Sequence, residues 1–250
     1  MQIIRGIVIT TGLFFLLLGV LLMSGMSNAP GIWLNNYLIG ATISAYAISI
    51  LWVAVTETYK AFIGGGISIM IALGGGGLSL LHLSTETRGM MYLGELCLYT
   101  AILFIWFFFL GLKFSKKSTH SLPSTTRWLF GLMFTVVLIE GLYLIVPIPG
   151  RFPWLLSQEF SIFYGWILMG SSLFFGWSFI QSSWDNGYPL LYSLIVYNML
   201  LIGPLLSLLK SSFQVTVIPF YLWFSIIVII GSGIWAIFEL INRFFSIKKS

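Results

Sequence analysis

Eight apolar stretches, each about 20 residues long, dominate the sequence. A helix rises 1.5 Å per residue and needs roughly 20 apolar residues to cross a membrane. The chain is 58% hydrophobic and 8% charged, whereas ordinary globular chains are roughly 25% charged. A soluble domain of 250 residues could not bury so much apolar surface. The sequence therefore predicts an all-α integral membrane protein and excludes a soluble enzyme, a nucleic-acid-binding protein and a disordered regulator.

Reading the chain against this length gives eight expected transmembrane helices. They run over 6–24, 33–55, 62–82, 90–112, 128–147, 157–180, 189–209 and 217–241. The third is the least regular, because it carries the glycine runs 64–66 and 74–77. The first has an alternative, because Arg5, the apolar run and the small residues 27–29 resemble a cleavable signal peptide. Pro30, directly after that site, opposes cleavage.

The basic residues of the loops predict how the chain is oriented. Lys and Arg are retained on the cytoplasmic side, and with the N-terminus inside, nine of the twelve fall on that side. The inner set is Arg5, Lys60, Lys113, Lys116, Lys117, Arg127, Arg243, Lys248 and Lys249, and the outer set is Arg88, Arg151 and Lys210. The net charge of +5 then faces anionic lipid and needs no nucleic-acid partner. We expect a cell-membrane protein with both termini in the cytoplasm.

The two halves of the chain match weakly but in the same order, which predicts a tandem repeat of four helices. Pro30-Gly31 recurs as Pro149-Gly150, Leu78-Ser79-Leu80-Leu81 as Leu206-Ser207-Leu208-Leu209, and Ile105-Trp106 as Ile234-Trp235. Two copies of four spans have the same orientation, as in parallel-repeat transporters. We expect one repeat at 1–112, a cytoplasmic linker at 113–127, and a second repeat at 128–250.

Ionisable groups within membrane spans are costly and are candidate functional residues. Glu95 and Glu140 are the two clear cases. In the expected topology they lie toward the outer surface, where Asn35, Asn36 and His82 also lie. These residues are therefore predicted to form an outward-facing polar cluster. The simpler alternative is that some of them reach interfacial water, and that Glu140 pairs with a basic loop residue.

Matched helix-breaking residues point to a second part of the same site. Gly75 and Gly76 of the third span correspond, in the repeat, to Gly203 and Pro204 of the seventh. Such residues can free backbone carbonyls, and paired interrupted helices are a sequence indicator of a transporter's binding site. Asn198 lies one to two turns away and is expected to face the same cavity. The alternative is that small residues simply let helices pack closely.

The sequence carries no recognisable catalytic or cofactor motif. His82 and His120 are expected on opposite sides of the membrane, so they cannot ligate one haem within one chain. The single cysteine, Cys97, provides neither a disulfide framework nor a metal site. There is no phosphate-binding loop, and the only aspartate, Asp185, is expected in a loop. We expect no metal, no cofactor and no enzymatic activity.

The function that these features favour is that of a small transporter or permease-like protein. Its polar site would lie between the two four-helix repeats and face outward. Glu95 and Glu140 would bind a proton or a cationic group. Asn35, Asn36 and Asn198 would orient the ligand, and rocking of one repeat against the other would give alternating access.

A second function follows from a resemblance. The eight-span, two-bundle plan resembles the quinone-binding anchor subunits of the polysulfide-reductase type, and segment 33–50, with Tyr37 and Gly40, is similar to an early helix of that family. The resemblance implies a quinone head group near Asn35, His82 and Glu140, with the catalytic cofactors in other subunits. A purely structural membrane subunit is the third alternative. Besides the lipid bilayer, the partners would be other membrane subunits or a second copy of the chain.

Overall fold

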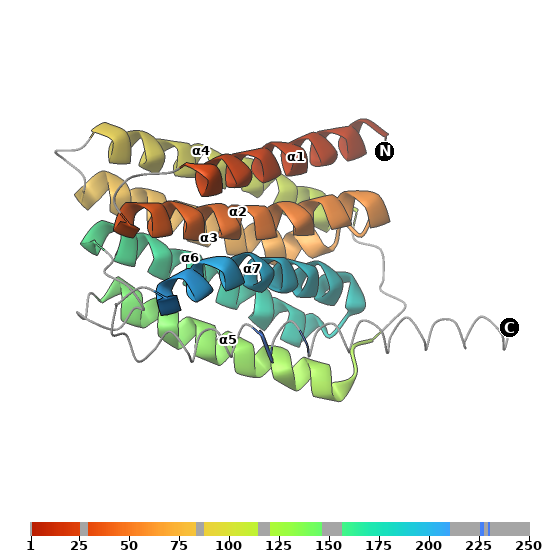
Figure 1. Ribbon diagram of the computed structural model, residues 1–250. Helices are drawn as coiled ribbons and strands as arrows, with labels where there is room; N and C mark the ends of the chain where they lie inside the picture. The colour runs from red at the N-terminus through yellow and green to blue at the C-terminus, as the bar shows by residue number, and fades with distance from the viewer. Residues whose placement is uncertain are drawn as a thin grey trace, which may run out of the picture. The chain divides into compact units, whose positions relative to one another are not determined.

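The computed structural model describes residues 2–25, 30–83, 88–114, 121–146 and 157–210, together with 226–227 and 230. These residues contain seven long α-helices (Figure 1). The helices are α1 (Gln2–Ser24), α2 (Pro30–Thr56), α3 (Ala61–Leu83), α4 (Arg88–Lys113), α5 (Ser124–Ile145), α6 (Gln158–Gln181) and α7 (Trp184–Lys210). Each is long and apolar enough to cross a membrane, so the chain is an all-α, multi-pass membrane protein.

The first seven expected spans coincide with these helices. The largest difference is at α7, which begins at Trp184 rather than at residue 189. Its first turn contains the polar residues Asp185 and Asn186. A span predicted from apolar residues alone leaves them out, but polar residues readily begin a helix outside the hydrocarbon core. The eighth expected span, 217–241, lies outside the described residues apart from isolated positions.

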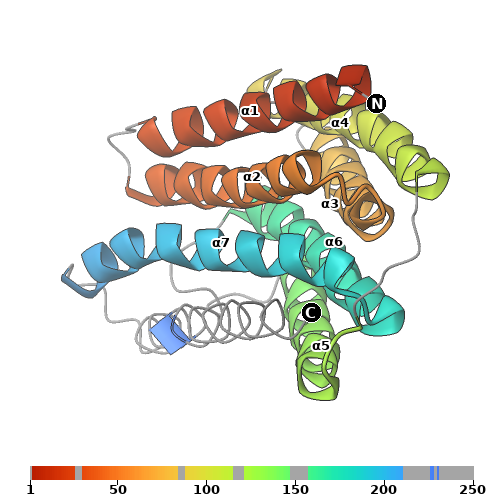
Figure 2. The same ribbon diagram turned by 90° about the vertical axis from the view of Figure 1, so that its right-hand side faces the viewer.

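Contacts within the chain divide it into two compact units. Unit 1 contains residues 1–10 and 50–190, and unit 2 contains residues 11–49 and 191–250. In unit 1, α4 packs on α3, α3 on α6, and α6 on α5 (Figure 1). In unit 2, α2 lies between α1 and α7 (Figure 2). The four complete helices of unit 1 thus form a row, with α4 and α5 at its two ends.

Helix α3 is helical throughout its glycine run, so the interruption suggested by the sequence is absent. The glycines instead leave space for rings of α6. A Cβ at Gly75 would overlap the indole of Trp166, and one at Gly76 would lie 2.7 Å from the ring of Phe163. Trp166 also donates a hydrogen bond from Nε1 to Ser79 Oγ, at 2.9 Å. Close packing of α3 on α6 therefore accounts for these residues.

A reciprocal glycine contact recurs in three consecutive helix pairs. The pairs are Gly19 with Gly40, Gly77 with Gly94, and Gly141 with Gly165. In each pair, a Cβ on either glycine would lie within 3.0 Å of the partner's carbonyl oxygen. Such contacts bring two helix backbones together, as small residues do in membrane proteins. The helix pairs α1–α2, α3–α4 and α5–α6 are thus built in the same way.

Substitution of Gly75 tests the packing of α3 on α6. Gly75→Ala should lower the free energy of unfolding by about 1–3 kcal/mol, because the methyl group has no space beside Trp166. Gly74→Ala is the matched control, since a Cβ there would meet only the Cβ of Ala101, at 3.9 Å. Thermal unfolding in mild detergent, followed by circular dichroism, measures both. Equal stability of the two variants would contradict this account.

Candidate functional site

The two carboxylates predicted within spans lie on exposed helix surfaces. Glu95 is exposed on α4 and Glu140 is exposed on α5. Glu95 follows the first residue of α4 by seven positions, which is about 10 Å along the helix, and Glu140 precedes the last residue of α5 by five, about 8 Å. Two helices, α3 and α6, lie between α4 and α5 in unit 1. The structure therefore does not bring Glu95 and Glu140 together.

The packing of α4 explains the exposure of Glu95. Gly94 and Cys97 face α3, where a Cβ at Gly77 would meet the carbonyl oxygen of Gly94 at 2.8 Å and the Cβ of Cys97 at 3.1 Å. Successive residues of an α-helix are rotated by about 100°. Glu95 is consequently turned away from α3, onto the outer face of the row.

In unit 2, the expected effect of Pro204 is present but the freed carbonyl is occupied. Proline has no amide hydrogen, so Pro204 cannot donate to the carbonyl of Leu200, four residues earlier. The hydroxyl of Tyr37, on α2, donates to that oxygen at 3.0 Å. Helix α7 continues through this position to Lys210. The bond between Tyr37 and Leu200 replaces the missing backbone bond and joins α2 to α7.

Two predicted asparagines are buried in the same unit. Asn35 is 6% exposed on α2, and Asn198 is 3% exposed on α7. Asn198 donates from Nδ2 to the carbonyl oxygen of Leu194, at 2.8 Å, within its own helix. Buried amides require hydrogen-bond partners. Asn35 and Asn198 are thus predicted site residues that are buried in unit 2. The part-buried hydroxyl of Tyr37 lies in the same unit.

The other predicted site residues are less enclosed. Asn36 is partly exposed on α2, and Gly203 is exposed on α7 while Pro204 is buried. His82 is exposed near the end of α3, in unit 1. Unit 1 therefore holds His82, Glu95 and Glu140, and unit 2 holds the asparagines.

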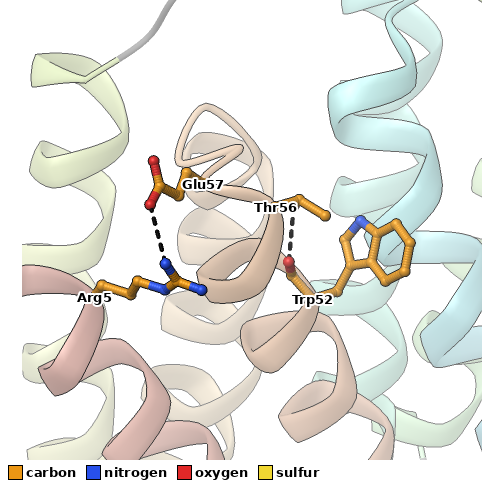
Figure 3. A network of polar contacts seen from close by, with 4 residues as sticks. All are labelled: Arg5, Trp52, Thr56 and Glu57. Atoms are coloured by element: carbon orange, nitrogen blue, oxygen red, sulfur yellow. Dashed lines mark hydrogen bonds and ion pairs between the residues drawn. The ribbon is translucent and has the colours of Figure 1, made fainter. Parts of the chain in front are cut away.

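A polar cluster that the sequence did not indicate lies at the end of α2 in unit 1. Arg5 Nη1 and Glu57 Oε1 form an ion pair at 3.4 Å (Figure 3). Both side chains are about half exposed, at 44% and 48%, so this pair contributes roughly 0–1 kcal/mol to stability. Glu57 has a φ of 56°, in the left-handed region, where it ends the helix. Thr56 Oγ1 donates to the Trp52 carbonyl at 2.8 Å (Figure 3).

Tyr59 lies next to this ion pair and is only 1% exposed. Its ring contacts those of Phe62 and Phe114, with centroid distances of 6.3 and 6.2 Å. Its hydroxyl has no hydrogen-bond partner among the residues that the structure describes. Burial raises the pKa of Tyr59, the negative charge of Glu57 raises it further, and Arg5 acts in the opposite direction.

Metal-binding groups do not gather in the described residues. There, no three His, Cys, Asp or Glu side chains are placed to hold a metal ion. Cys97 is buried as a free thiol beside Gly77.

Comparison with protein-family models, curated proteins and solved structures finds no match to this chain.

A double-mutant cycle tests the bond that replaces the backbone hydrogen bond at Pro204. Tyr37→Phe should lower the free energy of unfolding by about 1 kcal/mol, within the range measured for side-chain hydrogen bonds in membrane proteins. Pro204→Ala restores an amide donor to the Leu200 carbonyl, so Tyr37→Phe should cost much less in that background. Denaturant unfolding in detergent measures all four proteins. An equal cost of Tyr37→Phe in both backgrounds would rule out this role.

Tyr59 predicts a loss of stability at alkaline pH. Its pKa is higher in the folded state, so the folded protein holds the phenolic proton more tightly. The free energy of unfolding should be constant below the unfolded pKa, about 10, and fall as pH rises above it. Tyr59→Phe should reduce this fall and, at neutral pH, raise stability by about 1 kcal/mol, because it removes an unpaired hydroxyl. Tyr92→Phe, at a 67% exposed tyrosine, is the control in unfolding measurements from pH 8 to 11, and an identical effect of both variants would refute the assignment.

Proposed function

We propose that the chain is a membrane subunit that binds another membrane protein through the exposed face of α4. The observation that carries this proposal is the position of Glu95. This carboxylate lies about 10 Å along α4 from the first residue of the helix, within a span. It is exposed, on a surface that no described helix covers. An ionisable group at such a position is costly unless it has a partner.

The side chains around Glu95 form a surface suited to another helix. Tyr92 precedes it by one turn and Tyr99 follows it by one turn, and these side chains are 67% and 69% exposed. Residues three and four positions apart share a helix face. The stripe continues through Ile102 and Trp106, which are 62% and 40% exposed. We call Tyr92, Glu95, Tyr99, Ile102 and Trp106 the α4 stripe.

Charge indicates what the partner carries. All twelve Lys and Arg residues of the chain lie outside the expected spans. A second copy therefore offers no Lys or Arg within a span to pair with Glu95, and a different polypeptide with a basic residue in a transmembrane helix would. A buried charge-assisted bond of this kind is stronger than a neutral one.

The quinone-anchor function is one form of this proposal. It requires partner subunits that hold the catalytic cofactors, which the α4 stripe would bind. Glu140, exposed on α5 at the other end of the unit 1 row, offers a second lateral surface. The resemblance of segment 33–50 to an early helix of the anchor family supports this form.

Transport is the second candidate function, and the buried polar groups of unit 2 favour it. Asn35 and Asn198 are buried there, and Tyr37 covers the carbonyl freed by Pro204. A ligand that displaced Tyr37 would gain the Leu200 carbonyl as a backbone acceptor, as in transporters whose sites use unpaired helix backbone. Under this candidate, Glu95 and Glu140 would act as surface groups.

The orientation and the repeat belong to the proposal as well. Both termini would be cytoplasmic, in a cell membrane, on the strength of the loop charges. The proposed tandem repeat of four helices rests on the order of the sequence matches, since the reciprocal glycine contact occurs in α3–α4 as well as in α1–α2 and α5–α6.

Photo-crosslinking tests the α4 stripe. Benzoylphenylalanine in place of Tyr99, in the full chain in its native membrane, should give a crosslinked product with another membrane protein. The same probe in place of Phe104, which is 1% exposed, should give none. Glu95→Gln should lower the yield at position 99 about tenfold, because a hydrogen bond to a charged group contributes about 1.5–3 kcal/mol. Glu57→Gln is the control, because it removes a carboxylate that lies outside the helices, and it should leave the crosslinking yield unchanged.

The same experiment separates the two candidate functions. If position 99 gives adducts with lipid alone, the subunit proposal fails. If the purified chain then also moves a solute into sealed vesicles without other proteins, transport replaces it. A partner protein that depends on Glu95 would support the subunit function.

A further inference from the structure

A large apolar pocket lies between α5 and α6 in unit 1. Its volume is about 770 Å³, within the range of small-molecule binding sites. Four aromatic side chains contribute to its wall, Trp128 and Phe134 from α5 and Trp177 and Phe179 from α6. Thr135 contributes a hydroxyl, which donates to the Gly131 carbonyl of its own helix at 3.1 Å. The pocket therefore presents apolar surface to any occupant.

The pocket opens on an exposed side of unit 1. Trp128 is 67% exposed, Leu132 60% and Ile180 65%, and all three line it. These exposed residues lie on helices long and apolar enough to cross a membrane. A molecule that enters this pocket from the side comes from the bilayer, so an acyl chain is the natural occupant.

One cation is held at the edge of this pocket. Arg127 directly precedes Trp128, its Nε donates to the Phe179 carbonyl at 3.1 Å, and its guanidinium lies 5.0 Å from the centre of the Phe179 ring. The side chain is exposed. The bond to Phe179 uses Nε, so the two Nη groups stay available for an anion, and the planar guanidinium loses little freedom on binding.

The start of α5 is tied to the end of α6, which holds Arg127 in place. The Leu122 amide donates to the Ser182 carbonyl at 2.8 Å, and Ser121 and Ser183 form an isolated antiparallel bridge. These bonds join the segment before α5 to the segment after α6. The backbone bonds therefore fix where α5 begins relative to the end of α6, and the contacts with Phe179 hold the guanidinium at the pocket edge.

We propose that this pocket binds one acidic membrane phospholipid, with an acyl chain among the aromatic side chains and the phosphate on Arg127. Guanidinium groups form strong, charge-assisted bonds with phosphate oxygens. Basic residues beside pockets between transmembrane helices are suited to anionic lipid head groups. The wall is mostly apolar, and its polar groups include the Thr135 hydroxyl and the indole N–H of Trp177, whose nitrogen is buried without a partner among the described residues. Neutral groups of this kind do not balance the charge of a phosphate, so the acyl chain lies inside and the phosphate lies at Arg127. This proposal is independent of the function proposed for α4.

Native mass spectrometry of the full chain, purified in mild detergent, tests the lipid and its charge. Dioleoyl phosphatidylglycerol should bind about fivefold more tightly than dioleoyl phosphatidylcholine. This is about the gain in affinity for anionic lipid that one basic residue provides near a membrane surface. Arg127→Gln should remove this preference, and Arg127→Lys should keep part of it. Lys113→Gln is the matched control, because Lys113 also lies over a ring, 5.6 Å from the centre of Phe114, but beside no residue of the pocket.

A second pair of variants tests the pocket itself. Thr135→Trp places an indole in the pocket and should weaken binding of both lipids about tenfold. Ile139→Trp, one turn along α5 at a 46% exposed position outside the pocket, should leave binding unchanged. Circular dichroism and gel filtration identify any variant that is misfolded, and Arg127→Lys then provides the charge test in a conservative form.

Three results would overturn the proposal. Equal binding of the two lipids to the wild type would show that the charge on Arg127 plays no part in lipid recognition. If Arg127→Gln and Lys113→Gln lowered the preference for phosphatidylglycerol equally, the preference would reflect a general attraction between basic residues and anionic lipid. A co-purified molecule other than a phospholipid, lost in Thr135→Trp and kept in Ile139→Trp, would assign the pocket to that molecule.

Discussion

The close approach of helix backbones is the constraint on which the rest of this structure depends. Lipid chains are as apolar as leucine, so burial alone gives helices in a bilayer little reason to associate, and van der Waals packing has to provide it. Glycine makes that packing possible here. Gly75 and Gly76 leave space for the rings of Trp166 and Phe163, and Gly77 brings α3 against α4. The glycine run 74–77, which the sequence suggests as an interruption of the helix, is the part of α3 that packs on both α4 and α6.

Hydropathy was sufficient to predict the first seven helices, because the thickness of the bilayer sets their length. It also placed Glu95 within the fourth helix. It could not predict the direction in which Glu95 faces, because that depends on which side of α4 packs on α3. The residue that decides this is Gly94, and it has no side chain to contribute to a hydropathy pattern. Of the expected polar residues, Glu95 and Glu140 are exposed at the two ends of the unit 1 row, and Asn35 and Asn198 are buried in unit 2.

The binding features were predictable in part. The freed carbonyl follows from Pro204 alone, since proline lacks a donor, but its new donor, Tyr37, is 163 residues away and no local pattern connects the two. The apolar pocket combines residues of α3, α5 and α6, each of which reads in the sequence as an ordinary lipid-facing or packing residue. In the sequence, Arg127 indicates only the orientation of the chain, and the fold places it beside Phe179. Chemistry shared by distant segments requires tertiary structure.

The reciprocal glycine contact has a consequence for how the chain is assembled. Each contact joins two helices that are consecutive in sequence, as Gly19 joins Gly40, Gly77 joins Gly94, and Gly141 joins Gly165. Contacts between neighbours in the chain form quickly, because little loop entropy is lost. During synthesis from the N-terminus, each helix pair can close as soon as its second helix has entered the bilayer. The protein can therefore be built one hairpin at a time, and within unit 1 the α5–α6 pair docks through α6 onto α3 of a pair that is already complete.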